Sequence, residues 1–310
     1  MASRSKLLVF LLAAPALLAA DHVAFRQEPG KVHVLVDNKP FTTLHYGKEL
    51  DKVFLHPVRA ASGVAVTRGW PVDPVPGETT DHPHHRGLWW AQGATNGVDF
   101  WTNGPGTGRY VLKADPKLDP ERGAIRVEMD MTAPSGRVLG SLHEEYVFSA
   151  AGQNRMIDVW IQILADRDQE IRLGDTKEGD LGFRVADELT EPKGAALVNS
   201  EGGKGERQIW GKRARWVDSS GRVGGAVAGV AMFDHPSNPA FPTYWMARGY
   251  GLLAANATGL REFSGDNTLD GSITIPKGGQ LGFRYRVVIH PGDAASAKVD
   301  TLWQEYSRVK

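Results

Sequence analysis

The densest group of chemically capable side chains lies in residues 81–101, which read DHPHHRGLWWAQGATNGVDFW. The polar members of this stretch are Asp81, His82, His84, His85, Arg86 and Asp99. Histidine has an ordinary pKa near neutral pH, so it can accept or donate a proton during catalysis. The stretch therefore predicts a site for proton transfer, for metal binding, or for both.

Three interpretations of the histidines stay open at this point. In an extended chain His82 and His84 point to the same side, and two imidazoles on one side suit a divalent metal such as zinc. Without a metal, His84 or His85 is a candidate acid or base. The histidines can also serve only to hydrogen-bond backbone carbonyls in a tight polar loop. The cofactor is therefore undetermined, with a divalent metal as the candidate.

Three tryptophans, Trp89, Trp90 and Trp101, lie beside the histidines. Aromatic faces next to polar groups suit sugar rings, whose C–H faces stack while their hydroxyls bind charged side chains. Adjacent residues of a strand point to opposite sides, so at least one of Trp89 and Trp90 belongs to the core. We expect a small-molecule or saccharide ligand, with Arg86, Trp89 and Trp90 as candidate binding residues.

A glycine-bounded turn at residues 174–180, GDTKEGD, gathers three acids and a lysine. Glu178 or Asp175 can supply a carboxylate acid or base, and Lys177 is suited to stabilise developing negative charge. Arg184, in the segment that follows, is suited to bind a carboxylate or hydroxyl groups. The turn can equally be a solvated loop without chemistry.

Four polar residues nearer the C-terminus are further binding candidates. Asp234 and His235 repeat the Asp-His-Pro of the first stretch, and Arg284 and His290 share one face of an alternating segment. An acid, a base and a charge stabiliser must all reach one substrate. We therefore expect the following residues to surround a common pocket: His84, His85, Arg86, Lys177, Glu178 and Arg284.

The composition excludes several classes of function. Basic and acidic residues are equal in number, at 36 each, so nothing indicates binding to nucleic acid. There is no cysteine, which excludes thiol nucleophiles and thiolate metal sites. The motifs of serine hydrolases, zinc proteases and nucleotide-binding loops are also missing, so these chemistries are disfavoured.

The first twenty residues predict an export signal. Arg4 and Lys6 precede an apolar run at 7–18 that is short for a bilayer span, and two alanines precede Asp21. An uncleaved anchor is the alternative interpretation. We expect residues 1–20 to be a signal peptide, the protein to be periplasmic or secreted, and no integral membrane segment to follow.

Period-two alternation of apolar residues predicts most of the fold. It occurs at 124–131, 156–164 and 281–290, each with one apolar face. Only residues 294–308 show clear helical spacing. No shift in composition marks a boundary, so we expect residues 21–310 to form a single all-β domain. Its predicted architecture is a large antiparallel β-sandwich with one C-terminal helix.

Six segments resemble a family of exported bacterial proteins that carries the label methane oxygenase PmoA. The segments are FLHPVR (54–59), DHPHHRGLWW…NGVDFW (81–101), GDTKEGDLGFRV (174–185), WGKRARWVDSSG (210–221), FDHPSNP…YGLLAAN (233–256) and FRYRVVIHPGD (283–293). They occur in the family's order and cover nearly the whole predicted mature chain. The resemblance implies a supersandwich-like fold, as in sugar mutarotases and polysaccharide-lyase domains.

The family label implies metal-dependent oxidation, but a membrane methane monooxygenase subunit is a bundle of membrane-spanning helices, which this sequence does not predict after its signal. The family pattern also implies a histidine after the tryptophan that matches Trp245, whereas this chain has Met246. If that histidine belongs to the family's site, this chain has an altered one.

The sequence favours an exported β-sandwich enzyme that acts on a carbohydrate or sugar derivative, as a lyase, an epimerase or a hydrolase. In this hypothesis His84 or His85 is the acid or base, and Glu178 or Asp175 is the partner carboxylate. A non-catalytic carbohydrate-binding protein and a metal-dependent oxygenase are the two alternatives.

Overall fold

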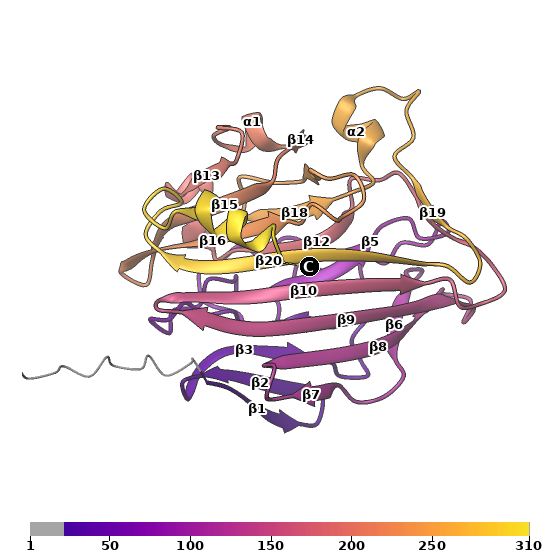
Figure 1. Ribbon diagram of the computed structural model, residues 1–310, viewed down its shortest axis with the longest axis horizontal. Coiled ribbons are helices and arrows are strands. Elements are labelled where there is room, and N and C mark those ends of the chain that lie inside the picture. Colours follow the sequence, from indigo (N-terminus) through magenta and orange to yellow (C-terminus); the bar gives the residue numbers. More distant parts are fainter. Residues whose placement is uncertain (1–21, 310) are drawn as a thin grey trace, which may run out of the picture.

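Two nine-stranded antiparallel sheets, here called sheet A and sheet B, form the body of the protein (Figure 1). The computed structural model describes residues 22–309, so the predicted signal peptide lies outside the described residues. Within residues 22–309, no helix is long and apolar enough to cross a membrane. The all-β sandwich expected from the alternation pattern is confirmed.

Sheet A has the strand order β1 (Val23–Glu28), β2 (Lys31–Val36), β3 (Lys39–His45), β4 (Phe54–Leu55), β5 (Leu88–Gln92), β12 (Gly179–Arg184), β18 (Leu252–Asn256), β17 (Tyr244–Trp245) and β14 (Lys212–Arg213). Sheet B has the order β13 (Ala196–Asn199), β15 (Trp216–Val223), β16 (Ala226–Asp234), β20 (Gln280–Pro291), β10 (Asn154–Leu164), β9 (Val138–Ala151), β8 (Ala124–Thr132) and β6 (Arg109–Leu112), with β7 (Lys117–Asp119) also paired to β8. A separate ribbon joins β11 (Ile171–Leu173) to β19 (Ile273–Ile275). The helical elements are α1 (Glu206–Ile209), α2 (Leu260–Ser264), α3 (Val299–Tyr306) and the 3₁₀ turns η1 (Asp187–Leu189) and η2 (Glu191–Lys193).

The main core lies between the two sheets. In sheet B, β8, β9 and β10 form an antiparallel meander whose alternate side chains are buried. Across the interface, Trp90 of β5 packs against Phe283 and Tyr285 of β20, with ring centroids 5.0 and 6.4 Å apart. The predicted alternation therefore marks the inner face of sheet B.

Because Trp90 points inward, its neighbour Trp89 points to the outer face of sheet A. Gly182 of β12 lies opposite Trp89 in the register, and Arg184 is two residues further along the same face. A Cβ atom at Gly182 would lie 2.5 Å from the Trp89 indole, so only glycine leaves room for the ring. This outer face carries the predicted histidine stretch.

The C-terminal helix is shorter than the sequence predicts. Helical spacing indicated residues 294–308, whereas α3 begins at Val299 and ends at Tyr306. Lys298 has a left-handed backbone with φ of 54°, which an L-residue cannot continue into a right-handed helix. Trp303 and Tyr306 pack α3 onto the outer face of sheet B, beside β15 and β16 (Figure 1).

One buried ion pair lies on the outer face of sheet B. Nε2 of His290 in β20 is 2.6 Å from Oδ2 of Asp218 in β15, and neither side chain is exposed. Gly229 of β16 lies directly opposite His290 in the register, and a Cβ there would come within 2.3 Å of the His290 ring. Burial disfavours charge on His290, but the hydrogen bond and the charge of Asp218 raise its pKa above the ordinary value.

One carboxyl is enclosed between the sheets. Glu144 of β9 has no exposed surface and accepts a hydrogen bond from the Tyr146 hydroxyl. Its Oε1 has no partner among the described residues. Burial raises the pKa of Glu144 to about 8, so the folded protein keeps this carboxyl protonated at neutral pH.

We predict that Asp218→Asn lowers the free energy of unfolding by about 3 kcal/mol, because removing one partner of a buried pair leaves the other uncompensated. Asp168→Asn is the control, since Asp168 pairs with Lys277 at the surface and such pairs contribute at most about 1 kcal/mol. Urea unfolding at pH 6, followed by tryptophan fluorescence, measures both. The effect must be largest below pH 6.5 and decline as pH rises through the raised pKa of His290. Equal values for the two variants would contradict a stabilising pair.

We also predict that Glu144→Gln makes stability less sensitive to pH. Between the ordinary pKa of 4.5 and the raised value of about 8, the folded state holds a proton that the unfolded state has lost, so stability falls as pH rises. The variant's slope should be shallower by up to about 1.4 kcal/mol per pH unit. Urea unfolding from pH 5 to 8 measures the slope. Glu145→Gln, on the outer face of the same strand, is the control, and an unchanged slope in Glu144→Gln would refute the assignment.

Candidate functional site

The three histidines of residues 81–101 lie together on the outer face of sheet A. They precede β5, and a turn in which the His85 amide donates to the His82 carbonyl at 3.0 Å brings their rings close. His82 is exposed, His84 is partly exposed, and His85 is buried. The site is therefore layered, with His85 at its base and the other two rings reachable from solvent.

A stack of nearly parallel rings lies in this site. The His82 ring is parallel to His85, at 4.7 Å and 5°, and to Tyr250, at 5.1 Å and 7°. His85 and Tyr250 are themselves 6.4 Å apart, so the three ring centres form a triangle. His85 in turn stacks on Trp89 at 5.3 Å. His84 meets the other two histidines edge to face, at 5.8 and 4.4 Å. The stack holds each imidazole in one orientation, as a proton-transfer site requires.

Asp81 is anchored by two arginines whose side chains are 0% exposed. Arg184 Nη2 lies 2.8 Å from Asp81 Oδ1, and Arg68 Nη1 donates to the same oxygen. The second oxygen, Oδ2, lies 3.0 Å from Nδ1 of His82. Burial alone would raise the pKa of Asp81, but Arg184, His82 and Arg68 hold it below its usual range. Asp81 is therefore a fixed carboxylate that orients His82.

A further layer holds the arginines in place. The Arg184 guanidinium lies over the Tyr250 ring at 4.6 Å, a cation–π contact. The Thr79 hydroxyl accepts a hydrogen bond from Arg184 at 3.3 Å. The Thr79 amide and hydroxyl in turn donate hydrogen bonds to the Asp187 carboxylate, at 2.7 and 2.9 Å. Strand β12, Tyr250 and η1 thus position Asp81 from three directions.

Burial keeps two of the histidines neutral. The pKa of His84 is lowered to about 4, chiefly by burial and then by the nearby charge of Lys52. The pKa of His85 lies far below its ordinary value, again chiefly because the ring is buried. His84 and Arg184 lower it further, because positive charge on them disfavours a charged His85. Nη1 of Arg184 lies 3.5 Å from Nδ1 of His85. At neutral pH His84 can therefore accept a proton, whereas His85 is better suited to support its neighbours.

Lys52 is a buried cation next to this group. Its Nζ donates to the carbonyls of Trp101 and Thr102, at 2.8 and 3.2 Å, and to Oδ1 of Asn103. Burial lowers the pKa of Lys52 to about 7, while the negative charges of Asp51 and Asp99 oppose this effect. Lys52 therefore holds the loop that carries Trp101, beside His84.

The predicted turn with Lys177 and Glu178 lies at the other end of β12 from Arg184. Burial raises the pKa of Glu178, and the charge of Asp99 adds to this effect. Glu178 in turn contributes to the raised pKa of Tyr250, after burial and Asp81. Lys177 pairs with Glu262 of α2 at 3.0 Å and lies 3.6 Å from Glu178.

Other predicted residues near this face have structural contacts. The Asp175 carboxylate accepts hydrogen bonds from the backbone amides of Arg261 and Gly271, at 3.1 and 2.6 Å. These bonds fix the segment that contains α2. Arg86 donates to the Pro83 carbonyl and lies over Phe54 at 5.7 Å. Trp90 is enclosed in the core between the sheets and cannot contact a ligand at the histidines.

Four predicted binding residues lie elsewhere, so the expected common pocket does not include Arg284. Arg284 points to the outer face of sheet B, opposite the inward Phe283 and Tyr285, and covers Trp160 at 4.5 Å. The remaining three residues support sheet B and α3. They are His290, paired with Asp218, and Asp234 and His235, which contact Trp303 and Val309. Alternation shows which residues share a face of one strand. It does not show which sheet the strand joins, or whether that face points into the core or outward.

A metal centre does not fit the histidines. Within the described part of the chain, no three His, Asp or Glu side chains have an arrangement that could hold a metal ion. His82 and His84 meet edge to face, and the nearby carboxylate of Asp81 is already bound by two arginines. Met246, where the PmoA-labelled family pattern implies histidine, is a buried residue after β17.

Sequence reasoning missed three members of the site, which are Arg68, Tyr250 and Lys52. Arg68 and Lys52 lie in residues 47–80, a segment rich in glycine and proline whose composition indicates only a loop. Tyr250 lies in the turn between Arg248 and β18, where Gly251 has a φ of 102°. Strand alternation does not extend through this turn, so nothing local in the sequence distinguishes any of the three residues.

The solved structures with which this chain aligns are distant in sequence. No curated protein matches the chain. Two GH36 α-galactosidases of Geobacillus stearothermophilus align at 10% identity over 87% of this chain, AgaB with a TM-score of 0.38 and AgaA, in complex with raffinose, with 0.36. The alignments cover 41% and 40% of those chains, so this protein spans about two fifths of their length. A galactose mutarotase-like protein of Clostridium acetobutylicum aligns at 10% identity and a TM-score of 0.37, over 88% of this chain and 99% of the other. These likenesses carry no argument about function.

A family model does match, with the description Family of unknown function (DUF6807), over residues 31–304. The matched region contains the histidines, both anchoring arginines and Tyr250. Because it extends over most of the chain, this protein belongs to the DUF6807 family.

Proposed function

We propose that the protein is an enzyme that binds a sugar or sugar derivative at the histidines of sheet A and transfers protons on it. The observation that carries the proposal is the pairing of solvent-accessible His82 with Asp81, beside the neutral His84. Two fully buried arginines fix Asp81, and stacking rings fix His82. Such preorganisation is typical of proton-transfer sites.

His84 is the proposed general base. It is partly exposed, and burial holds its pKa at about 4, so its imidazole is unprotonated at neutral pH. The nearby cations Lys52 and Arg86 both disfavour a charged His84 in the resting protein. They also favour negative charge that develops on a bound substrate, as an electrostatic stabiliser must.

His82 and Asp81 form the proposed second proton-transfer unit. Asp81 Oδ2 lies 3.0 Å from His82 Nδ1 and leaves Nε2 of the ring to face a substrate. A carboxylate in this position selects one tautomer and stabilises the imidazolium that forms during transfer. The site thus offers one histidine that accepts a proton and another that can carry one.

Aromatic and charged residues beside the histidines support a sugar as the substrate class. Arg248 lies over both Tyr250 and Trp210, at 5.7 and 6.0 Å, and is 3.3 Å from Glu206. Aromatic faces next to donors and acceptors of this kind suit the C–H faces and hydroxyls of a sugar ring. The extended binding surface in this proposal therefore consists of Tyr250, Trp210, Arg248 and Glu206.

Export is a separate part of the proposal. Residues 1–20 are proposed to be a signal peptide, and the protein to act in the periplasm or outside the cell. The relationship to the PmoA-labelled family is likewise part of this proposal, without the oxidative chemistry of that label.

We predict that His84→Ala lowers turnover by about 10²- to 10⁴-fold, the usual contribution of a general base, with substrate affinity changed little. Time-resolved proton NMR with a panel of aldoses, uronic acids and oligosaccharides identifies the substrate and measures turnover. His33→Ala, on β2 away from the site, is the control. Wild-type turnover in His84→Ala would exclude the assigned base. Saccharide binding that Tyr250→Ala abolishes, without turnover in the wild type, would instead establish the non-catalytic alternative.

We predict that the catalytic rate is lost as pH falls through about 4, where His84 becomes protonated. A base acts only when unprotonated, so the rate must rise with pH through this value and then level off. The pH–rate profile of the wild-type protein from pH 3.5 to 7 measures this, with circular dichroism at each pH to confirm folding. An acid limb centred above pH 6 would contradict an unprotonated His84 at neutral pH.

A further inference from the structure

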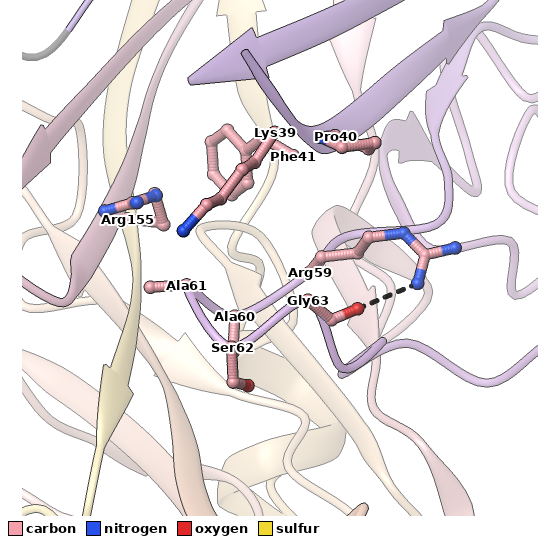
Figure 2. A pocket seen from close by; sticks show the side chains of 9 residues that line it. All are labelled: Lys39, Pro40, Phe41, Arg59, Ala60, Ala61, Ser62, Gly63 and Arg155. Carbon is pink, nitrogen blue, oxygen red and sulfur yellow. Dashed lines mark hydrogen bonds between the residues drawn. The ribbon is translucent and has the colours of Figure 1, made fainter. Parts of the chain in front are cut away.

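A cavity of about 340 Å³ is lined by none of the residues of the histidine site (Figure 2). Its lining comes from the start of β3, from residues 59–63 and from the start of β10. Because β3 belongs to sheet A and β10 to sheet B, the cavity lies where the two sheets meet beside the β9–β10 hairpin. None of its lining residues belongs to the proposed catalytic site.

The lining of this cavity is positively charged. Lys39, Arg59 and Arg155 contribute to it, and no acidic residue does. None of these three cations pairs with a carboxylate among residues 22–309. Figure 2 shows the Lys39 side chain extending toward the side of the cavity where Arg155 lies. Like charges held together without a counter-charge repel each other, and a bound anion removes that repulsion.

Arg155 is the strongest indication of a ligand, because its side chain is largely buried. The residue is 7% exposed, and only its Nη1 has partners, the carbonyls of Gly152 and Asn154, each at 3.0 Å. Those bonds close the β9–β10 turn and explain why the side chain is held in place. Nε and Nη2 donate to no described residue, so one edge of the guanidinium fork is free to bind an oxyanion.

The other walls give the cavity a shape suited to a small ligand. Phe41, 2% exposed, forms an apolar wall and packs against Phe148 of β9. Arg59 is fixed by a bond from Nη1 to the Gly63 carbonyl at 3.0 Å, which holds residues 59–63 as a tight turn. The site therefore combines two fixed guanidinium groups, one exposed amine and one apolar surface.

We propose that this cavity binds a small oxyanion, held by the free edge of Arg155 and by Lys39. The shared chemistry is a group with two or more oxygens and a negative charge: a phosphate, a sulfate or the carboxylate of an acidic sugar. The apolar wall at Phe41 leaves room for a small organic substituent on that group. This inference is independent of the proposed proton-transfer function.

Calorimetric titration of the full chain tests the proposal, with inorganic phosphate, sulfate and D-glucuronate as probes at constant ionic strength. We expect the wild type to bind at least one probe and Lys39→Gln to bind it about tenfold more weakly, as loss of one charge-assisted hydrogen bond predicts. Arg155→Lys keeps the charge but loses the fork, so we expect a loss at least as large. Lys31→Gln, at the far end of the same β2–β3 hairpin, is the matched control.

The pattern across probes identifies the source of the oxyanion. Binding of D-glucuronate alone indicates a carboxylate ligand, and binding of phosphate or sulfate alone indicates a tetrahedral one; both support the site. Lys39 is exposed, so its substitution leaves the fold intact and the test does not depend on the Arg155 variant. No binding of any probe by the wild type, or equal affinities in Lys39→Gln and Lys31→Gln, would overturn the proposal.

Discussion

The alternation of side chains along β5 is the constraint on which both the core and the candidate site depend. Trp90 points inward and packs against Phe283 and Tyr285, which joins the two sheets. Trp89 must then point outward, where it becomes the base on which His85 stacks. A shift of one residue in this strand would expose the core tryptophan and remove the support of the histidines. Stability of the sandwich and geometry of the site are therefore set by the same register.

Burial of charge serves different purposes at different places in the molecule. At the site, Arg68 and Arg184 lose their contact with solvent to hold one carboxylate, Asp81, which stays 38% exposed. A second buried carboxylate, Asp187, adds negative charge near Arg184, so two cations and two anions form this network. The pair of Asp218 and His290 is different, because both members are enclosed and balance each other. The network around Asp81 therefore fixes a partly exposed carboxylate, whereas the enclosed pair joins two strands of sheet B.

The sequence predicted the strands well because their information is local. In β8, β10 and β20, apolar side chains at every second position follow directly from one buried face. The histidine stretch could also be located, since its members are neighbours in the chain. Tyr250 and Arg68 could not, because they reach the site only through pairing of distant strands and a long loop. The prediction that Arg284 lies at the histidine site was wrong for the same reason. Alternation groups Arg284 with His290, but it does not reveal on which sheet, or on which face of that sheet, the two residues lie. The helix was predicted too long because the left-handed residue Lys298 has no signal in an apolar pattern.

The electrostatics of the site narrow the chemistry that it can perform. Burial lowers the pKa values of His84, His85 and Lys52 together, so this region resists additional positive charge. It nevertheless contains the permanent cations Arg68 and Arg184, whose charge Asp81 only partly offsets. A substrate that becomes positively charged would meet repulsion there, whereas one that becomes negatively charged would be stabilised. Removal of a proton from a hydroxyl, or from a carbon next to a carbonyl, produces such a negative charge. Within the proposed function, this charge distribution favours proton abstraction by the neutral His84 over reactions in which the substrate passes through a cation.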